Sequence, residues 1–307
     1  MEITPTTTAE NLIPTGSPAL PALAYLSTLS SKESVRGMTS SLNAIAAVLT
    51  GVADYRLNAA IIAAAVASLE GAPATKNKAL AAMKGLARSA YRLDWISGEC
   101  YTKIKDINGY RGSRQVTGRQ LEMEEIGALL SACREDHSPA GLRDTALFSI
   151  ACITGARRAE LVSLELGNLS ETDESLAEIT VIGKGQKQRS LYLHGKAVKA
   201  LDAWLDLRGR SPGKLFTRIT QTGELSTEGM STAALAKILK KRLGQANLTN
   251  VRMHDLRRSV CGNLLDAGHS LSTVADILGH SSPQVTARYD LRGKRAAVAA
   301  SRTLSLP

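Results

Sequence analysis

The spacing of apolar residues changes character near residue 118. Before that point apolar residues recur at steps of three and four, as in residues 35–49, which is the period of an amphipathic helix. Beyond it, helical patterns are joined by two short β-branched or alternating runs at 179–182 and 189–193. A chain of 307 residues is long enough for two domains. We therefore expect a mainly α protein with a small β-sheet confined to an α+β second domain.

The first part of the chain predicts a tail followed by an all-helical domain. Residues 1–17 are rich in Thr and Pro, which favours a flexible tail. Helical patterns follow at 35–49, 59–69 and 75–96, so we expect a helical domain over residues 18–100. Residues 101–117 combine basic side chains with Gly, Ser and Asn, which predicts a basic linker between the domains.

Basic residues recur every four positions on the third helical pattern, and the linker adds more. The chain has 38 Lys and Arg against 28 Asp and Glu, which favours a polyanionic partner without establishing one. A helix face of this kind could follow a DNA phosphate backbone, but a solvated surface explains the same spacing. The candidate DNA-binding residues are Lys76, Lys84, Arg88, Arg92, Arg111 and Arg114.

Four cysteines are spread along the chain without a Cys-x-x-Cys pair, so neither a zinc module nor a disulfide framework is predicted. We expect them to be reduced core residues of a cytosolic protein. The longest apolar run, 59–69, is too short to cross a bilayer, and the N-terminus lacks a basic, apolar leader. No export and no membrane insertion are therefore expected.

A basic hairpin is predicted in the second domain. Gly183-Lys184-Gly185-Gln186 separates the two predicted strands, which places Lys184 on a β-turn. This segment is not a Walker A loop, because the earlier Gly and the following Ser or Thr are missing. Charge at a hairpin tip is usually solvated; the functional alternative makes Lys184 a proton donor on a loop.

Arg157 follows the break Thr154-Gly155-Ala156 at the end of an apolar helix, and Glu160 lies three residues further on. A basic residue here could simply suit the helix dipole, with Glu160 as its surface partner. The alternative is an Arg157 that clamps a non-bridging phosphate oxygen, with Glu160 fixing its guanidinium.

Two histidines, an arginine and a tyrosine complete the set of candidates. His254 and Arg257 are three apart on a predicted helix, so they share one face and could meet one phosphate. His280 follows a glycine that ends a helix, and Tyr289 ends a short motif rich in charge. Each of these residues could instead have a purely structural role, as a capped or partly buried side chain.

Five elements, taken in order, make the chain resemble the catalytic domain of the tyrosine recombinase (phage integrase) family. They are Thr-Gly-x-Arg-x-x-Glu-Leu at 154–161, Gly-Lys-Gly-x-Lys-x-Arg at 183–189, His-x-Leu-Arg at 254–257, Leu-Gly-His at 278–280 and Thr-x-x-Tyr at 286–289. The resemblance covers residues 118–292, within a catalytic domain expected over 118–295. The helical domain before it resembles the core-binding domain of that family.

The resemblance implies a role for each candidate residue. Tyr289 would attack the scissile phosphate and form a 3′-phosphotyrosyl bond, while Arg157, Arg257 and His280 stabilise the phosphorane. Lys184 would protonate the leaving 5′-oxygen and His254 would assist proton movement at the nucleophile. Neither a nucleotide cofactor nor a metal is implied.

The resemblance also implies partners. They are double-stranded DNA with inverted-repeat core sites and three further copies of the chain, forming a tetramer on two sites, in a cytoplasmic, nucleoid-associated protein. Residues 296–307 have a short apolar face and are expected to dock on a neighbouring protomer.

The departures from the family pattern are Ala156, Arg158 and the pair Arg258-Ser259, which bear on substrate geometry more than on activity. A type IB topoisomerase, which shares the nucleophile and the cations, is the nearest rival. A non-enzymatic DNA-binding protein is the rival from another class.

Overall fold

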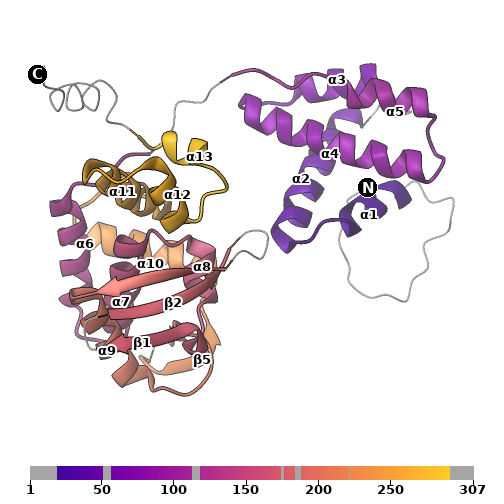
Figure 1. Ribbon diagram of the computed structural model, residues 1–307. Coiled ribbons are helices and arrows are strands. Elements are labelled where there is room, and N and C mark those ends of the chain that lie inside the picture. The colour runs from indigo at the N-terminus through magenta and orange to yellow at the C-terminus, as the bar shows by residue number, and fades with distance from the viewer. Residues whose placement is uncertain are drawn as a thin grey trace, which may run out of the picture. The chain divides into compact units, whose positions relative to one another are not determined.

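A computed structural model describes residues 19–50, 57–112, 118–173, 176–183, 188–220 and 222–290 (Figure 1). The chain forms two compact units, divided between Gln115 and Val116. The predicted tails at 1–17 and 296–307 lie outside the described residues. Among the residues described, no helix is both long and apolar enough to span a membrane.

The N-terminal unit is helical throughout the part that the structure describes. Its helices are α1 (Leu20–Ser27), α2 (Lys32–Leu49), α3 (Ala59–Ser68), α4 (Pro73–Arg92) and α5 (Gly98–Lys105). The side chains of Ser31, Asn58 and Ser97 each accept a backbone hydrogen bond at a helix start, as N-caps do. The apolar faces of the helices meet in one core, to which Ile45 and Val66 contribute fully buried side chains.

The N-terminal unit extends further along the chain than the sequence predicts. Ile104 of α5 is fully buried in its core, and the Asn77 side chain bonds both the backbone N–H and the carbonyl of Tyr110. Residues 101–110, predicted as linker, therefore pack within this unit. Helix α4 ends at Arg92 and not near residue 96, because Asp94 adopts a left-handed backbone with φ 58°.

The C-terminal unit is mainly α with a small antiparallel sheet, which confirms the predicted fold class. Its helices are α6 (Met123–Arg134), α7 (Pro139–Thr154), α8 (Arg158–Ser163), the 3₁₀ turn η1 (Leu166–Asn168), α9 (Lys196–Arg208), α10 (Thr232–Gln245), α11 (Met253–Asp266), α12 (Leu271–Leu278) and α13 (Pro283–Ala287). Its strands are β1 (Leu169–Asp173), β2 (Leu176–Ile182), β3 (Gln188–His194), β4 (Thr217–Ile219) and β5 (Leu225–Gly229).

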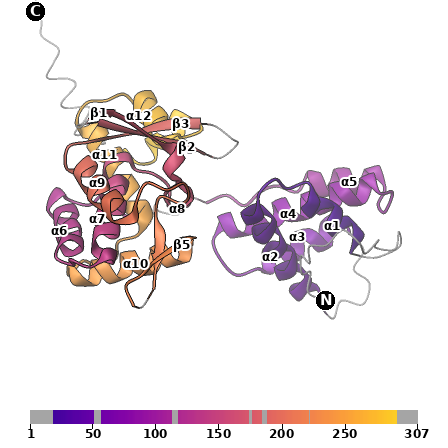
Figure 2. The ribbon, with the colours of Figure 1, turned by 90° about the horizontal axis from the view of Figure 1, so that it is seen from below.

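Helix α7 is the centre of the C-terminal core. Every residue from Arg143 to Ala151 is buried, and α7 packs against α6, α9 and α11. Strands β1, β2 and β3 form an antiparallel meander along one side of the unit, with α7 and α9 next to it (Figures 1 and 2). Alternate residues of β2 are buried, so this sheet presents one face to the core. Strands β4 and β5 form a separate hairpin.

Helix α11 carries a segment of extended chain along its side. The N–H of Leu121 donates to the hydroxyl of Ser259 at 2.8 Å, and the Gln120 amide donates to Asn263 at 2.9 Å. Ser259 in turn donates to the carbonyl of Asp255. The first described residues of the C-terminal unit are thus fixed to the helix that contains His254 and Arg257.

Candidate active site

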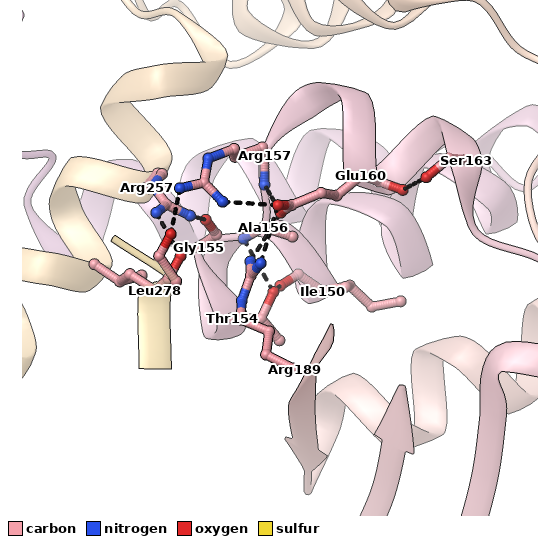
Figure 3. Close-up of polar contacts among 11 residues, drawn as sticks. Ile150, Thr154, Gly155, Ala156, Arg157, Glu160, Ser163, Arg189, Arg257 and Leu278 are labelled. Carbon is pink, nitrogen blue, oxygen red and sulfur yellow. Dashed lines mark hydrogen bonds and ion pairs between the residues drawn. The ribbon is translucent and has the colours of Figure 1, made fainter. Parts of the chain in front are cut away.

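The turn between α7 and α8 positions Arg157. Gly155 ends α7 with φ 61°, and a Cβ atom there would lie 2.6 Å from Leu278, so this tight turn requires glycine. Arg157 follows at the start of α8, where its backbone N–H donates to Glu160 at 2.7 Å. Its guanidinium donates to the same carboxylate at 2.8 Å (Figure 3). It also donates to the carbonyl of Gly279.

Glu160 is a buried carboxylate shared by two arginines. Besides the hydrogen bonds from Arg157, it accepts hydrogen bonds from both Nη groups of Arg189 on β3, at 3.0 and 2.8 Å (Figure 3). Burial alone would raise its pKa, but the hydrogen bonds from Arg189 and Arg157 lower the pKa of Glu160 to about 2. The carboxylate is therefore ionised near neutral pH and fixes the plane of the Arg157 guanidinium.

Arg257 is buried on α11 and donates to two backbone carbonyls from different helix ends. The acceptors are Gly155 at 2.7 Å and Leu278 at 2.5 Å (Figure 3). Burial, followed by the neighbouring charge of Arg157, lowers the pKa of Arg257 to about 10, which still leaves it charged at neutral pH. Arg157 and Arg257 therefore contact adjacent carbonyls, those of Gly279 and Leu278, from two different helices.

Tyr289 lies beside both histidines. Its hydroxyl is 2.7 Å from Nε2 of His254, and its ring stacks on that of His280 with centroids 5.6 Å apart. Desolvation and then the charges of Arg257 and Arg258 lower the pKa of His254, which favours a neutral ring able to accept a proton.

His280 is also neutral near pH 7. Burial, then the charges of Arg257 and Arg157, lower its pKa to about 4. Nδ1 of His280 lies 2.7 Å from the hydroxyl of the buried Thr286. In the tautomer in which Thr286 donates to Nδ1, Nε2 bears the proton and is a hydrogen-bond donor.

Five of the six predicted catalytic residues come together in the C-terminal unit. Arg157, His254, Arg257, His280 and Tyr289 form a continuous cluster at the ends of α7, α12 and α13 and the start of α11. Lys184 lies outside the described residues, between the ends of β2 and β3. Such a cluster combines a phenol, its proton acceptor and fixed cations, which suits attack on a phosphodiester.

Two further residues belong to this cluster without a role predicted from the sequence. Arg189 pairs with Glu160, and Arg258 lies over the Tyr289 ring, 5.4 Å from its centroid. A signal was available for each: Arg189 closes the Gly-Lys-Gly-x-Lys-x-Arg element, and Arg258 follows His254 by four residues and so shares its helix face.

The predicted DNA-binding residues of the N-terminal unit divide into two kinds. The side chain of Lys84 donates to the carbonyl of Ile107 at 2.7 Å, and that of Lys76 donates to the carbonyl of Ala67 at 2.6 Å. Both ammonium groups therefore have partners within the fold. Arg88, Arg92 and Arg111 are exposed, and Arg114 lies outside the described residues.

Within the described ranges, no group of three or more His, Cys, Asp and Glu side chains is arranged to hold a metal ion. Cys133 and Cys261 are buried, while Cys100 and Cys152 are partly buried.

Known proteins resemble this chain in sequence and in fold. Tyrosine recombinase XerC of Haemophilus ducreyi is 33% identical over 194 residues, which are 62% of this chain and 60% of the relative. The match thus spans less than two thirds of that relative's length. The crystal structure of XerH site-specific recombinase bound to palindromic difH substrate aligns with TM-score 0.71 and 21% identity, covering 95% of this chain and 97% of the other.

A lambda integrase tetramer bound to a Holliday junction aligns with TM-score 0.63 and 16% identity, covering 88% of this chain and 75% of the other. At these identities the two solved structures establish the fold. The sequence profile of the phage integrase family matches residues 119–293, which contain every residue of the cluster around Tyr289. The chain is therefore a member of the phage integrase family.

Proposed function

We propose that this protein is a site-specific DNA recombinase that cleaves and rejoins strands through a 3′-phosphotyrosyl intermediate. The single observation that carries the proposal is the position of the Tyr289 hydroxyl, 2.7 Å from Nε2 of His254, within the cluster that also contains Arg157 and Arg257. A phenol with a proton acceptor and fixed cations suits transfer of a phosphodiester to the side chain.

In the proposed step, the oxygen of Tyr289 bonds to the scissile phosphorus while the bond from phosphorus to the 5′-oxygen breaks. His254 takes the phenolic proton, and Lys184 gives a proton to the leaving 5′-oxygen. Arg157, Arg257 and His280 donate hydrogen bonds to the non-bridging oxygens, where negative charge develops.

The arginines are suited to this role because they are fixed before DNA arrives. A guanidinium has five N–H donors, and the bonds between described residues use two on Arg157 and two on Arg257. The donors that remain on these guanidinium groups would meet the phosphate. The phosphotyrosyl bond conserves the energy of the phosphodiester, so religation by a 5′-hydroxyl consumes no nucleotide.

Strand exchange requires a second site, so the proposed substrate is double-stranded DNA with inverted-repeat core sites, bound by four protomers on two sites. The lambda integrase tetramer on a Holliday junction supports this arrangement by analogy of fold. Such a substrate implies a cytoplasmic protein associated with the nucleoid. Docking of residues 296–307 on a neighbouring protomer remains a prediction.

The experiment that tests the proposal uses a library of nicked duplexes with randomised sequence. Protein and library are incubated, covalent adducts are captured under denaturing conditions, and the attached DNA is sequenced to identify a selected duplex. Tyr289→Phe should give no adduct, because it lacks only the attacking oxygen. The control is Tyr192→Phe, which alters an exposed tyrosine of the same unit and should react as the unchanged protein does.

An adduct from Tyr289→Phe would remove Tyr289 from the role of nucleophile. The topoisomerase alternative has a separate readout, since such an enzyme relaxes supercoiled plasmids that lack any selected site. If the wild-type protein binds duplex DNA but never forms an adduct, the result would favour a non-enzymatic DNA-binding protein.

A further inference from the structure

Arg258 is a buried cation placed against the reactive tyrosine, although the reaction proposed above gives it no task. We propose that Arg258 is a positioning residue that fixes the ring of Tyr289, and that Gly118 provides the space that keeps Arg258 there. The inference rests on the proposed role of Tyr289 as nucleophile. Arg258 does not touch the reacting atoms; it acts through the ring.

The helix places Arg258 for this contact. Residues four apart lie on one face of a helix, so His254 and Arg258 of α11 both reach Tyr289. His254 meets the hydroxyl at 2.7 Å, while the guanidinium carbon of Arg258 lies 5.4 Å from the ring centroid. At this distance a guanidinium is attracted by the electrons of the ring face. One helix therefore controls both the oxygen and the ring of the tyrosine.

Tyr289 lies at the end of a short element, so contacts of its side chain contribute to fixing its position. It follows α13, a helix of only five residues, and its N–H bonds the carbonyl of Thr286 within the same turn. Its ring is half-buried against the small apolar cluster formed by α11 and α12. A side chain at the end of so short an element would otherwise sample several rotamers, and attack in line with a phosphate requires one of them.

Arg258 is held within the protein and is not presented to solvent. The residue is 5% exposed, and its Nε has no hydrogen-bond partner among the residues described. An unpaired buried guanidinium nitrogen costs stability, so burial for packing alone is a poor explanation of this residue. The ring face of Tyr289 is a favourable neighbour for that charge.

Gly118 lies against the Arg258 guanidinium. Its φ is +133°, and a Cβ atom there would lie 2.6 Å from Nη1 of Arg258 and 2.3 Å from Oδ1 of Asp255. The chain cannot easily move away, since Leu121 is bonded to Ser259 on the same helix. Any side chain at residue 118 would therefore push the guanidinium from its place.

The first test reads the tyrosine ring directly and needs no DNA. In protein with ¹³C-labelled tyrosine, the resonance of Tyr289 is assigned by its absence from Tyr289→Phe. We expect Arg258→Met to shift and broaden this resonance, and Arg258→Lys to change it less because the cation is retained. The matched control is Arg143→Met, which removes an equally buried arginine of α7 away from Tyr289 and should leave the resonance unchanged.

The second test measures adduct formation on the selected duplex. Loss of a cation–π contact of this kind should slow adduct formation by Arg258→Met about 5- to 30-fold, with duplex binding unchanged. A 5′-bridging phosphorothiolate, whose leaving group needs no proton, should rescue Lys184→Ala but not Arg258→Met. This separates a defect of the nucleophile from a defect of proton donation.

The glycine gives a variant that leaves Arg258 in the sequence. Gly118→Ala should reproduce the shifted resonance and the slower reaction. Its control is Gly213→Ala, because Gly213 has nearly the same φ, +134°, but only an ordinary contact at 3.6 Å. Both substitutions strain the backbone, and only the first displaces a guanidinium.

The outcomes are distinct. An unchanged Tyr289 resonance in both Arg258→Met and Gly118→Ala would overturn the inference, as would equal effects of Arg258→Met and Arg143→Met. If Arg258→Met fails to fold, Arg258→Lys and Gly118→Ala still decide. Should the unchanged protein form no adduct at all, the proposed function fails, while the resonance continues to report whether Arg258 fixes the ring.

Discussion

The cations of the two units are held in different ways. Around Tyr289, Arg157 and Arg257 each donate to backbone carbonyls at helix ends, and Glu160 fixes one of them. On α4 of the N-terminal unit, Arg88 and Arg92 are exposed side chains. The hydrogen bonds around Tyr289 fix the orientation of the guanidinium groups, whereas the arginines of α4 only add positive charge to the surface.

This difference indicates what each set can contribute. Donors fixed by the fold can stabilise charge at one point without reorganising, and so suit a transition state. Exposed arginines suit contacts with a phosphate backbone, whose strength depends on salt more than on geometry. Substitutions that keep charge but change shape should therefore affect the first set far more than the second.

The largest effect is expected from Arg257→Lys. Lysine retains the charge but cannot bridge the carbonyls of Gly155 and Leu278 as the planar guanidinium does. We expect adduct formation on the selected duplex to fall about 10²- to 10³-fold, with duplex binding nearly unchanged. Arg88→Lys is the matched control and should react normally. Equal rates for the two variants would break the contrast between fixed and surface cations.

A smaller effect is expected from Glu160→Gln. The neutral amide would hold Arg157 and Arg189 less firmly, and adduct formation should slow about tenfold. Glu165→Gln, which alters an exposed glutamate paired with Lys214, is the control and should have no effect on the rate.

Glu160→Gln should also change the dependence of the free energy of unfolding on pH. The folded pKa of Glu160, about 2, lies below the unfolded value of about 4.3, so its stabilisation is complete above the unfolded pKa. It is lost as pH falls from there toward 2, and amounts to at most about 3 kcal/mol. Urea unfolding at pH 7 and pH 3 should show a smaller difference for Glu160→Gln than for Glu165→Gln; an identical difference would contradict the ionised, buried carboxylate.

The smallest effects are expected on α4 of the N-terminal unit, where Lys84 is bonded within the fold and Arg88 and Arg92 are exposed. Replacing Arg88 and Arg92 together by Gln should flatten the salt dependence of duplex binding by up to about two phosphate contacts, with stability unchanged. Lys84→Gln should instead lower the free energy of unfolding by about 1 kcal/mol, because its bond to the carbonyl of Ile107 is lost. Arg36→Gln, on α2, is the exposed control for both measurements. If the Lys84 and Arg88 variants changed duplex binding and stability in the same way, the distinction between the two kinds of basic residue on α4 would be wrong.

Much of the site could be predicted because the residues are arranged by local rules. The spacing of three between His254 and Arg257 puts both at the start of one helix, and Gly155 and Gly279 end helices where the sequence predicts it. The fold class followed from apolar periodicity in the same way. The catalytic and DNA-binding roles all stay predictions, and Lys184 and Arg114 also lie outside the described residues.

What could not be predicted depends on contacts between distant segments. Arg189 of β3 pairs with Glu160 of α8 although 29 residues separate them, and the Lys84 ammonium donates to the carbonyl of Ile107, which follows α5. The predicted linker was too long at its start for the same reason, because Gly, Ser and Asn indicate a loop but not whether the loop packs. Periodicity reports one element at a time.

The chain from Gly118 to Leu121 has a practical consequence for experiments that exchange the N-terminal unit in order to change the DNA specificity proposed above. Because Gln120 and Leu121 are hydrogen-bonded to α11, these residues are structurally part of the C-terminal unit. A fusion point placed after them would import a foreign strand against the helix that contains His254. Chimeras should therefore be joined before Gly118, so that the recipient keeps its own residues 118–121.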